Sequence, residues 1–270
     1  MSRTRRLRLC ADDFALGPAV DRGLLALAAQ GRLGALSCLA SSPRWPQAAT
    51  ALRSLPAGVQ VGLHFNLTEG EPLSAGLRRH WPRLPSLRRL LALAALGQLA
   101  RPALAAAIAD EWTAQLERFV SVHGRPPRFF DGHQHVHALP GVRDTLLAAA
   151  RRLGVPLRDT GRILGPGHAL KRQIIEACGG RALHRALQAQ GVAHASALLG
   201  VYDFHPRADY RALMRGWLAT LPDGALLFCH PAMGGPDAGD AIGVARQREA
   251  DYLASPAFVD DLAEFGVSLY

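Results

Sequence analysis

Three histidines occupy alternate positions in the short stretch from Asp131 to His137, at His133, His135 and His137. In a β-strand, residues i, i+2 and i+4 point to the same face, so an extended conformation would align all three imidazoles. Imidazole is the commonest metal ligand in proteins and the usual acid or base near neutral pH. The pattern therefore predicts a functional site. The alternative is a polar loop of histidine-rich composition, because the chain contains 11 histidines.

Other residues suited to metal binding or proton transfer stand where predicted strands end. Asp12 and Asp13 follow the first strand, and His64 ends the third. His230 follows a late apolar strand. In parallel α/β folds the carboxyl ends of the strands meet on one side, where active sites form. A carboxylate with two imidazoles makes an open divalent-metal site, and a further acid and histidine can transfer protons. This set of groups suits metal-assisted hydrolysis of an amide or an ester.

The elements that must position these residues alternate between apolar strands and amphipathic helices. Such alternation predicts an α/β fold with mostly parallel strands and helical crossovers. The predicted strands cover residues 6–11, 35–40, 59–64, 128–131, 156–158, 192–199, 224–229 and 267–269. The predicted helices cover residues 18–30, 46–55, 86–99, 102–122, 142–153, 169–190 (with a break at Gly179-Gly180), 208–221 and 256–265. Residues 66–85 and 234–243 are predicted to be loops, the first long enough to be functional.

Composition limits the classes of protein to which the chain can belong. Its 270 residues are 49% hydrophobic, and no composition shift marks a boundary, so we expect one domain over residues 1–270. The net charge is +9, but Lys171 is the single lysine and the arginines are dispersed. This dispersion argues against a nucleic-acid partner and leaves a weak peripheral attraction to anionic membranes open. The four cysteines form no CxxC pair, which argues against a zinc knuckle or a disulfide framework.

Neither a membrane span nor a secretory leader is expected from the sequence. The most apolar run, residues 90–100, is too short to cross a bilayer and is flanked by Arg89 and Arg101. The basic start, Met1 to Arg6, leads into no apolar signal-peptide region. A cytoplasmic location is the expectation.

Four blocks of the sequence resemble the signature blocks of the YdjC-like carbohydrate deacetylases, in the same order and at similar spacing. They are Ala11-Asp12-Asp13-Phe14, Gly62-Leu63-His64-Phe65-Asn66-Leu67-Thr68, Asp131-Gly132-His133-Gln134-His135-Val136-His137 and Cys229-His230-Pro231-Ala232. The resemblance implies a distorted (β/α) barrel that removes N-acetyl groups from amino sugars with one divalent metal ion. One departure is visible, because a glycine usually follows the Phe of the first block and this chain has Ala15.

Carried over position by position, the resemblance implies a role for each of five residues. Asp13, His64 and His133 would bind the metal. Asp12 would be the general base that activates water, and His230 the general acid that protonates the departing amine. Each has a structural alternative: an aspartate can cap a turn, and a lone histidine on an apolar strand is often a hydrogen-bonded core residue.

Four further residues are candidates for binding substrate. His135 and His137 line the site or support it, with a structural hydrogen bond as the alternative. Arg158 would hold a carboxylate or a sugar hydroxyl unless it forms an ion pair. Phe65 would stack on a sugar ring, as would Trp81, unless it packs in the core. The remaining histidines have no supporting pattern and are expected to be surface or structural residues: His80, His123, His168, His184, His194 and His205.

The leading prediction is a metal-dependent N-deacetylase that releases acetate from an N-acetylated amino sugar. Its substrate would be a chito-oligosaccharide or an N-acetylglucosaminyl glycolipid, including one linked to a hopanoid. A non-catalytic sugar-binding protein of the same fold is one rival, and a phosphoesterase is another, although two-metal phosphoesterases carry more carboxylates. Two imidazoles favour zinc over magnesium, but both metals stay open, as does a homodimer.

Overall fold

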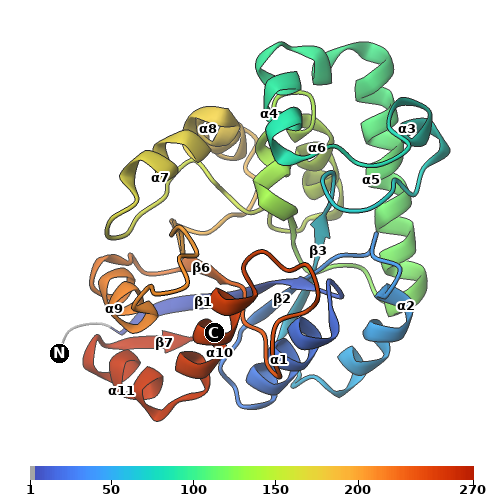
Figure 1. The fold of residues 1–270 in the computed structure, drawn as a ribbon. Coiled ribbons are helices and arrows are strands. Elements are labelled where there is room, and N and C mark those ends of the chain that lie inside the picture. The colour runs from blue at the N-terminus through green and yellow to red at the C-terminus, as the bar shows by residue number, and fades with distance from the viewer. Residues whose placement is uncertain (1–3) are drawn as a thin grey trace.

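Parallel strands form a central sheet in the computed structural model, which describes residues 4–270 (Figure 1). Within these residues the strand order is β4-β3-β2-β1-β6-β5, and β7 pairs with the first residues of β1. Every strand pairing is parallel, as the alternation of elements predicts. The strands are β1 Arg5–Phe14, β2 Ala35–Cys38, β3 Gln60–Phe65, β4 Phe130–Gly132, β5 Leu198–Leu199, β6 Ala225–Cys229 and β7 Val267–Leu269.

The sheet curls into a half-barrel (Figure 1), and the segment of residues 157–163 reaches both of its edges. Leu157 forms a bridge with Phe130 of β4, and Ile163 forms a bridge with Leu198 of β5. The prediction of a distorted (β/α) barrel with mostly parallel strands is therefore confirmed. The predicted strand at residues 156–158 is reduced to one of these bridges, and that at 192–199 is reduced to β5.

Helices connect the strands, as expected for parallel pairing, and α3 to α6 gather beyond β3 in Figure 1. No helix of residues 4–270 is long and apolar enough to span a bilayer. The helices are α1 Pro18–Ala29, α2 Trp45–Ala48, α3 Ala75–His80, α4 Leu87–Ala95, α5 Pro102–His123, α6 Arg143–Leu153, α7 Ala169–Ile175, α8 Arg181–Ala189, α9 Tyr210–Thr220, α10 Gly243–Ala254 and α11 Pro256–Glu264. Short 3-10 turns cover Ala49–Ser54, Gln98–Ala100 and His133–Ala138, and a π turn covers Glu176–Gly180.

Two helices differ from the sequence prediction. The short helix α3 lies inside the predicted loop at residues 66–85, where Ser74 caps its first turn by accepting from the Leu77 N–H. Helix α10 occupies a stretch for which the sequence pattern predicts no element. The predicted break at Gly179-Gly180 is confirmed. Gly179 has φ +140°, and a Cβ there would lie 2.1 Å from the Ala138 carbonyl oxygen.

The histidine stretch does not extend the strand that precedes it. Strand β4 ends at Gly132, and the chain then turns, with Gln134 at φ 53° and His135 at φ 60°. A Cβ at Gly132 would lie 2.9 Å from the His137 backbone nitrogen, so the glycine allows the turn to fold back on the strand. The extended alignment of the three imidazoles is therefore wrong.

Helix α5 packs across the strands that carry His64 and Asp131. Trp112 of α5 lies edge-on to Phe65 of β3, with ring centroids 5.4 Å apart, and to Phe130 of β4 at 4.8 Å. Aromatic pairs at this spacing stabilise packing beyond the area they bury. The contacts fix the ends of β3 and β4 relative to each other, next to the candidate site.

Candidate active site

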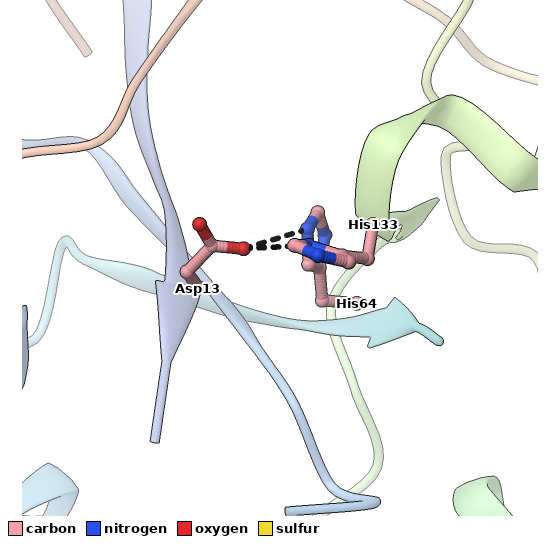
Figure 2. A group of neighbouring side chains, drawn as sticks. All are labelled: Asp13, His64 and His133. Atoms are coloured by element: carbon pink, nitrogen blue, oxygen red, sulfur yellow. Dashed lines mark hydrogen bonds and ion pairs between the residues drawn. The ribbon is translucent and has the colours of Figure 1, made fainter. Parts of the chain in front are cut away.

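Asp13, His64 and His133 come together from three separate elements (Figure 2). Asp13 lies near the end of β1, His64 in β3, and His133 in the turn after β4. Asp13 Oδ1 lies 2.8 Å from His133 Nδ1 and 3.4 Å from His64 Nε2. All three residues are buried. The structure thus places one carboxylate oxygen between two imidazole nitrogens, as a compact set of metal-binding atoms requires.

The backbone at the end of β1 turns two consecutive acids toward the same cavity. The pairing of β1 with β2 shifts register between Ala11 and Phe14, and Asp13 has φ 72°. Adjacent residues of a regular strand would point to opposite faces. Ala15 also has a positive φ, of 74°. The alanine thus adopts a conformation for which glycine pays no steric penalty, and the departure from the usual glycine leaves the turn intact.

A second carboxylate orients His64. Asp131 Oδ1 lies 2.7 Å from His64 Nδ1 and accepts a 2.5 Å hydrogen bond from the Ser37 hydroxyl. Because Nδ1 is held by Asp131, His64 presents Nε2 to Asp13. Metal-binding histidines are commonly held in this way, with the second ring nitrogen bonded to a carboxylate. One carboxylate and two oriented imidazoles fit a divalent metal ion.

The acids around this cluster strongly favour positive charge. Burial disfavours the imidazolium of His64, but Asp131, Asp12 and Asp13 outweigh burial and raise its pKa to about 10. Burial would also raise the pKa of Asp13, yet His133 and Arg246 hold it well below its usual range. Burial also disfavours the charged form of His133, but Asp13 outweighs burial and raises the pKa of His133. The cluster therefore attracts cations, whether protons or a metal ion.

Asp12 lines the cavity beside this cluster and is fixed by Arg158. Arg158 Nη1 donates to Asp12 Oδ2 at 2.6 Å, and Nη2 donates to Oδ1 at 2.7 Å. The side chain of Arg158 is only 1% exposed. The structure therefore favours an ion pair over the alternative in which Arg158 holds substrate.

His230 lies in the same cavity, at the end of β6. Burial lowers the pKa of His230 to about 4. Its backbone N–H donates to Glu249 Oε2 at 2.5 Å, and Glu249 Oε1 accepts a 2.5 Å hydrogen bond from Tyr202. Glu249 is fully buried, so this contact fixes the chain at His230.

The cavity has a volume of about 580 Å³ and is lined by both polar and apolar residues. The polar ones include Asp12, Asp13, His133, His135 and His230. The apolar ones include Leu87, Ile175, Val201, Phe204 and Phe228, and the loop from Asp237 to Ile242 also lines it. A cavity of this size accommodates a small organic ligand with both polar and apolar parts.

The four predicted substrate-binding residues separate in the structure. His135 lines the cavity, with its ring edge-on to Phe228 at 5.1 Å. His137 is buried, and its Nε2 lies 3.0 Å from the Arg158 carbonyl oxygen. Phe65 is fully buried against Trp112 and does not line the cavity. His137 therefore makes a structural hydrogen bond and Phe65 packs in the core, which are the alternatives to substrate binding, and Trp81 is buried as well.

Two charged residues of α10 were not anticipated from the sequence. Arg246 Nη2 lies 2.6 Å from Asp13 Oδ2, and its Nε lies 2.8 Å from Asp240 in the cavity loop. Glu249 supports His230. Their spacing in the sequence could have indicated that they are buried, because Arg246 and Glu249 share a helix face with the buried Ala250 and Leu253. Charges on the apolar face of a helix are seldom buried without a partner.

Comparisons with known proteins agree with the fold. A family model described as YdjC-like protein matches residues 6–264. A carbohydrate deacetylase from Mus musculus is 36% identical over 157 residues, which are 56% of this chain and 48% of that protein. A chitooligosaccharide deacetylase from Serratia marcescens is 33% identical over 156 residues, which are 55% of this chain and 56% of that protein.

These matches therefore span about half the length of the curated relatives. The crystal structure of a proposed cellobiose-phosphate cleavage protein from Enterococcus faecalis V583 is similar over 99% of this chain and 97% of that one. The TM-score is 0.75 at 21% identity, which shows a shared fold. Because the family model covers nearly the whole sequence, the chain belongs to the YdjC-like protein family.

Proposed function

We propose that this protein is a metal-dependent hydrolase that removes the N-acetyl group from an N-acetylated amino sugar and releases acetate. One observation carries the proposal: Asp12, Asp13, His133 and His230 line one cavity, and His64 lies beside Asp13 and His133 in the candidate metal cluster. The names of the relatives support a carbohydrate substrate. We further propose that residues 1–270 act as one deacetylase domain.

The metal ion would be held by Asp13, His64 and His133. When bound, a zinc or magnesium ion there would polarise the acetyl carbonyl and lower the pKa of water. The two imidazoles favour zinc or another transition metal.

Asp12 is the proposed general base. It accepts a proton as the water oxygen forms a bond to the acetyl carbon. Arg158, which does not line the cavity, binds both oxygens of the Asp12 carboxylate, so the carboxylate keeps a fixed orientation while it receives the proton. Orientation of this kind is a large part of what a catalytic group contributes.

His230 is the proposed general acid. It donates a proton to the nitrogen as the carbon–nitrogen bond breaks, which leaves acetate and a free amine. Burial and the nearby Arg246 lower the pKa of His230, although Asp13 opposes them. The imidazolium is therefore a strong acid. Negative charge that develops on the substrate favours transfer of a proton to His230, which then gives that proton to the nitrogen. Glu249 keeps the His230 backbone in place.

The sugar of the substrate would lie against the acids and histidines of the cavity, which include His135. The apolar lining residues favour a substrate with an apolar part, such as an N-acetylglucosaminyl glycolipid, over a free chito-oligosaccharide. Parallel assays with diacetylchitobiose and with an N-acetylglucosaminyl lipid in detergent separate the two, and higher kcat/KM on the lipid is expected.

Acetate release by the purified, zinc-loaded protein tests the function. Asp12→Asn is expected to lower turnover at least about 10²-fold, the usual contribution of a general base, while the bound metal stays unchanged. Asp260→Asn, an exposed site on α11, is the matched control and keeps full activity. Sugar binding without acetate release in the wild type would favour the non-catalytic alternative, and full activity of Asp12→Asn would rule out Asp12 as the base.

A further inference from the structure

A second group of metal-binding side chains lies outside the cavity. It consists of Asp159, His184 of α8 and His194, which follows α8 in the chain. One ligand atom of each lies within 4.8 Å of those of the other two. Asp159 Oδ2 is 2.6 Å from His184 Nδ1, and the His184 and His194 rings are nearly perpendicular with centroids 5.9 Å apart. These two histidines have no supporting pattern in the sequence, and only the fold brings them together.

Close packing sets Asp159 against His184. A Cβ at Gly161 would lie 2.3 Å from the Gly180 carbonyl oxygen and 2.5 Å from the His184 Cβ. The absence of a side chain at Gly161 therefore lets the start of α8 approach this segment. The Gly161 N–H donates to Asp159 Oδ1 at 2.8 Å, which leaves Oδ2 directed at His184. The buried Asp159 side chain is thus held in one orientation by the backbone N–H two residues later in the chain.

The orientation of His194 is also suited to a ligand. Its Nδ1 lies 2.8 Å from the Val192 carbonyl oxygen, which can only accept a hydrogen bond, so Nδ1 carries the proton. The lone pair is then on Nε2, the usual arrangement of a metal-binding histidine. His194 also lines a cavity of about 230 Å³, and both histidines are partly exposed, so an ion can reach the group.

We propose that Asp159, His184 and His194 form a second metal site, specific for divalent transition metals such as Zn²⁺. Two imidazoles and one carboxylate suit zinc, nickel or copper better than magnesium or calcium, which prefer oxygen ligands. Bonds of about 2.0–2.2 Å in a tetrahedral site separate ligand atoms by roughly 3.4 Å. Asp159 Oδ2 and His184 Nδ1 therefore have to part by less than about 1 Å, which side-chain rotation allows. Water would complete the coordination.

The role of this site would be structural. It joins α8, the chain at His194 and the segment of residues 157–163 that reaches both edges of the sheet. Arg158, which binds Asp12, directly precedes Asp159. The proposal does not depend on the proposed catalytic activity, because metal content and thermal stability are measured without substrate.

The test is a metal count on protein without an affinity tag, stripped with chelator and dialysed against buffered zinc. The wild type is expected to retain two equivalents of zinc. His184→Ala and His194→Ala should each retain one, and Asp13→Asn should also retain one, at the second site. His205→Ala, which removes an exposed histidine elsewhere, should retain two. Circular dichroism checks that each variant folds, and His194→Gln is a milder replacement.

The Asp13→Asn protein isolates the second site. Zinc at about 100 times its dissociation constant should raise the Tm of this variant by about 5 °C, and Asp13→Asn/His194→Ala should show no rise. Magnesium should have no effect on either. The proposal is overturned if Asp13→Asn retains no zinc, or if the His184 and His194 variants still retain two equivalents. Loss of acetate release with both equivalents retained would instead contradict the proposed function alone.

Discussion

Arg158 binds the carboxylates of Asp12 and Asp131 at the same time. Its terminal nitrogens lie 2.6 and 2.7 Å from the two oxygens of Asp12, and Nη2 is 2.5 Å from Asp131 Oδ2. All three side chains are buried. One guanidinium therefore links the proposed general base to the acid that orients His64.

Replacement of Arg158 by lysine should lower turnover and leave substrate binding almost unchanged. A lysine keeps the charge but cannot bind both oxygens of Asp12, so the base loses its orientation. We expect kcat to fall about 10²-fold with KM within about twofold, and Arg151→Lys on the exposed face of α6 to have no effect. A large rise in KM at constant kcat would instead restore Arg158 as a substrate-binding residue.

Asp131→Asn should weaken metal binding at the Asp13–His64–His133 cluster. The change removes negative charge beside the cluster and weakens the hold on His64 Nδ1, and both effects act in the same direction. Loss of such an orienting carboxylate typically lowers metal affinity about 10–100-fold. Competition with a zinc chelator measures the affinity, with Asp144→Asn, whose side chain is 79% exposed, as control. Unchanged affinity would mean that Asp131 serves only to pair with Arg158.

Glu249 should make the protein less stable as the pH rises. Burial raises its pKa from 4.5 to about 7, despite the opposing hydrogen bonds from Tyr202 and the His230 N–H. The folded state then binds more protons than the unfolded state between these values. The contribution of Glu249 is thus fully present below pH 4.5 and is lost as the pH rises through 7.

The expected loss from Glu249 is about 3 kcal/mol, since one pKa unit corresponds to about 1.4 kcal/mol. Urea unfolding at several pH values between 4 and 8 gives the slope of the free energy of unfolding against pH. The difference in this slope between the wild type and Glu249→Gln measures the loss. Glu117→Gln, an exposed site on α5, should keep the wild-type slope. Equal slopes in wild type and Glu249→Gln would show that Glu249 has the same pKa in the folded and the unfolded state.

Phe65→Leu should affect stability alone. The ring contacts Trp112 and lies outside the cavity lining, so its loss should lower the free energy of unfolding by about 1 kcal/mol without changing KM. His135→Ala should raise KM without lowering the free energy of unfolding, because His135 lines the cavity. Denaturant unfolding and steady-state kinetics on both variants check the pair. A raised KM for Phe65→Leu would reinstate the sugar-stacking role.

The sequence was a good guide to the groups that stand at strand ends and a poor guide to what surrounds them. Asp13, His64 and His133 meet because parallel strands end on one side, a property that alternation of elements predicts. The turn at His135 depends on two left-handed residues without glycine, for which local sequence gives no signal. Arg246 and Glu249 reach the site from a helix some 230 residues after Asp12, and only tertiary packing shows their partners.

The proposed roles of Asp12 and Asp13 both depend on the left-handed backbone conformation at Asp13. Asp12 and Asp13 both reach the cavity only because β1 departs from regular geometry between Ala11 and Phe14. A slip of one residue in the pairing of β1 would reverse the face of every side chain after it. Both acids would move by one place in the same direction, so that one of them takes the place of the other and the second acid leaves its present position. The functions of the two aspartates are therefore set by strand register, and a single inserted or deleted residue in β1 would leave the site with one correctly placed acid instead of two, without changing either side chain.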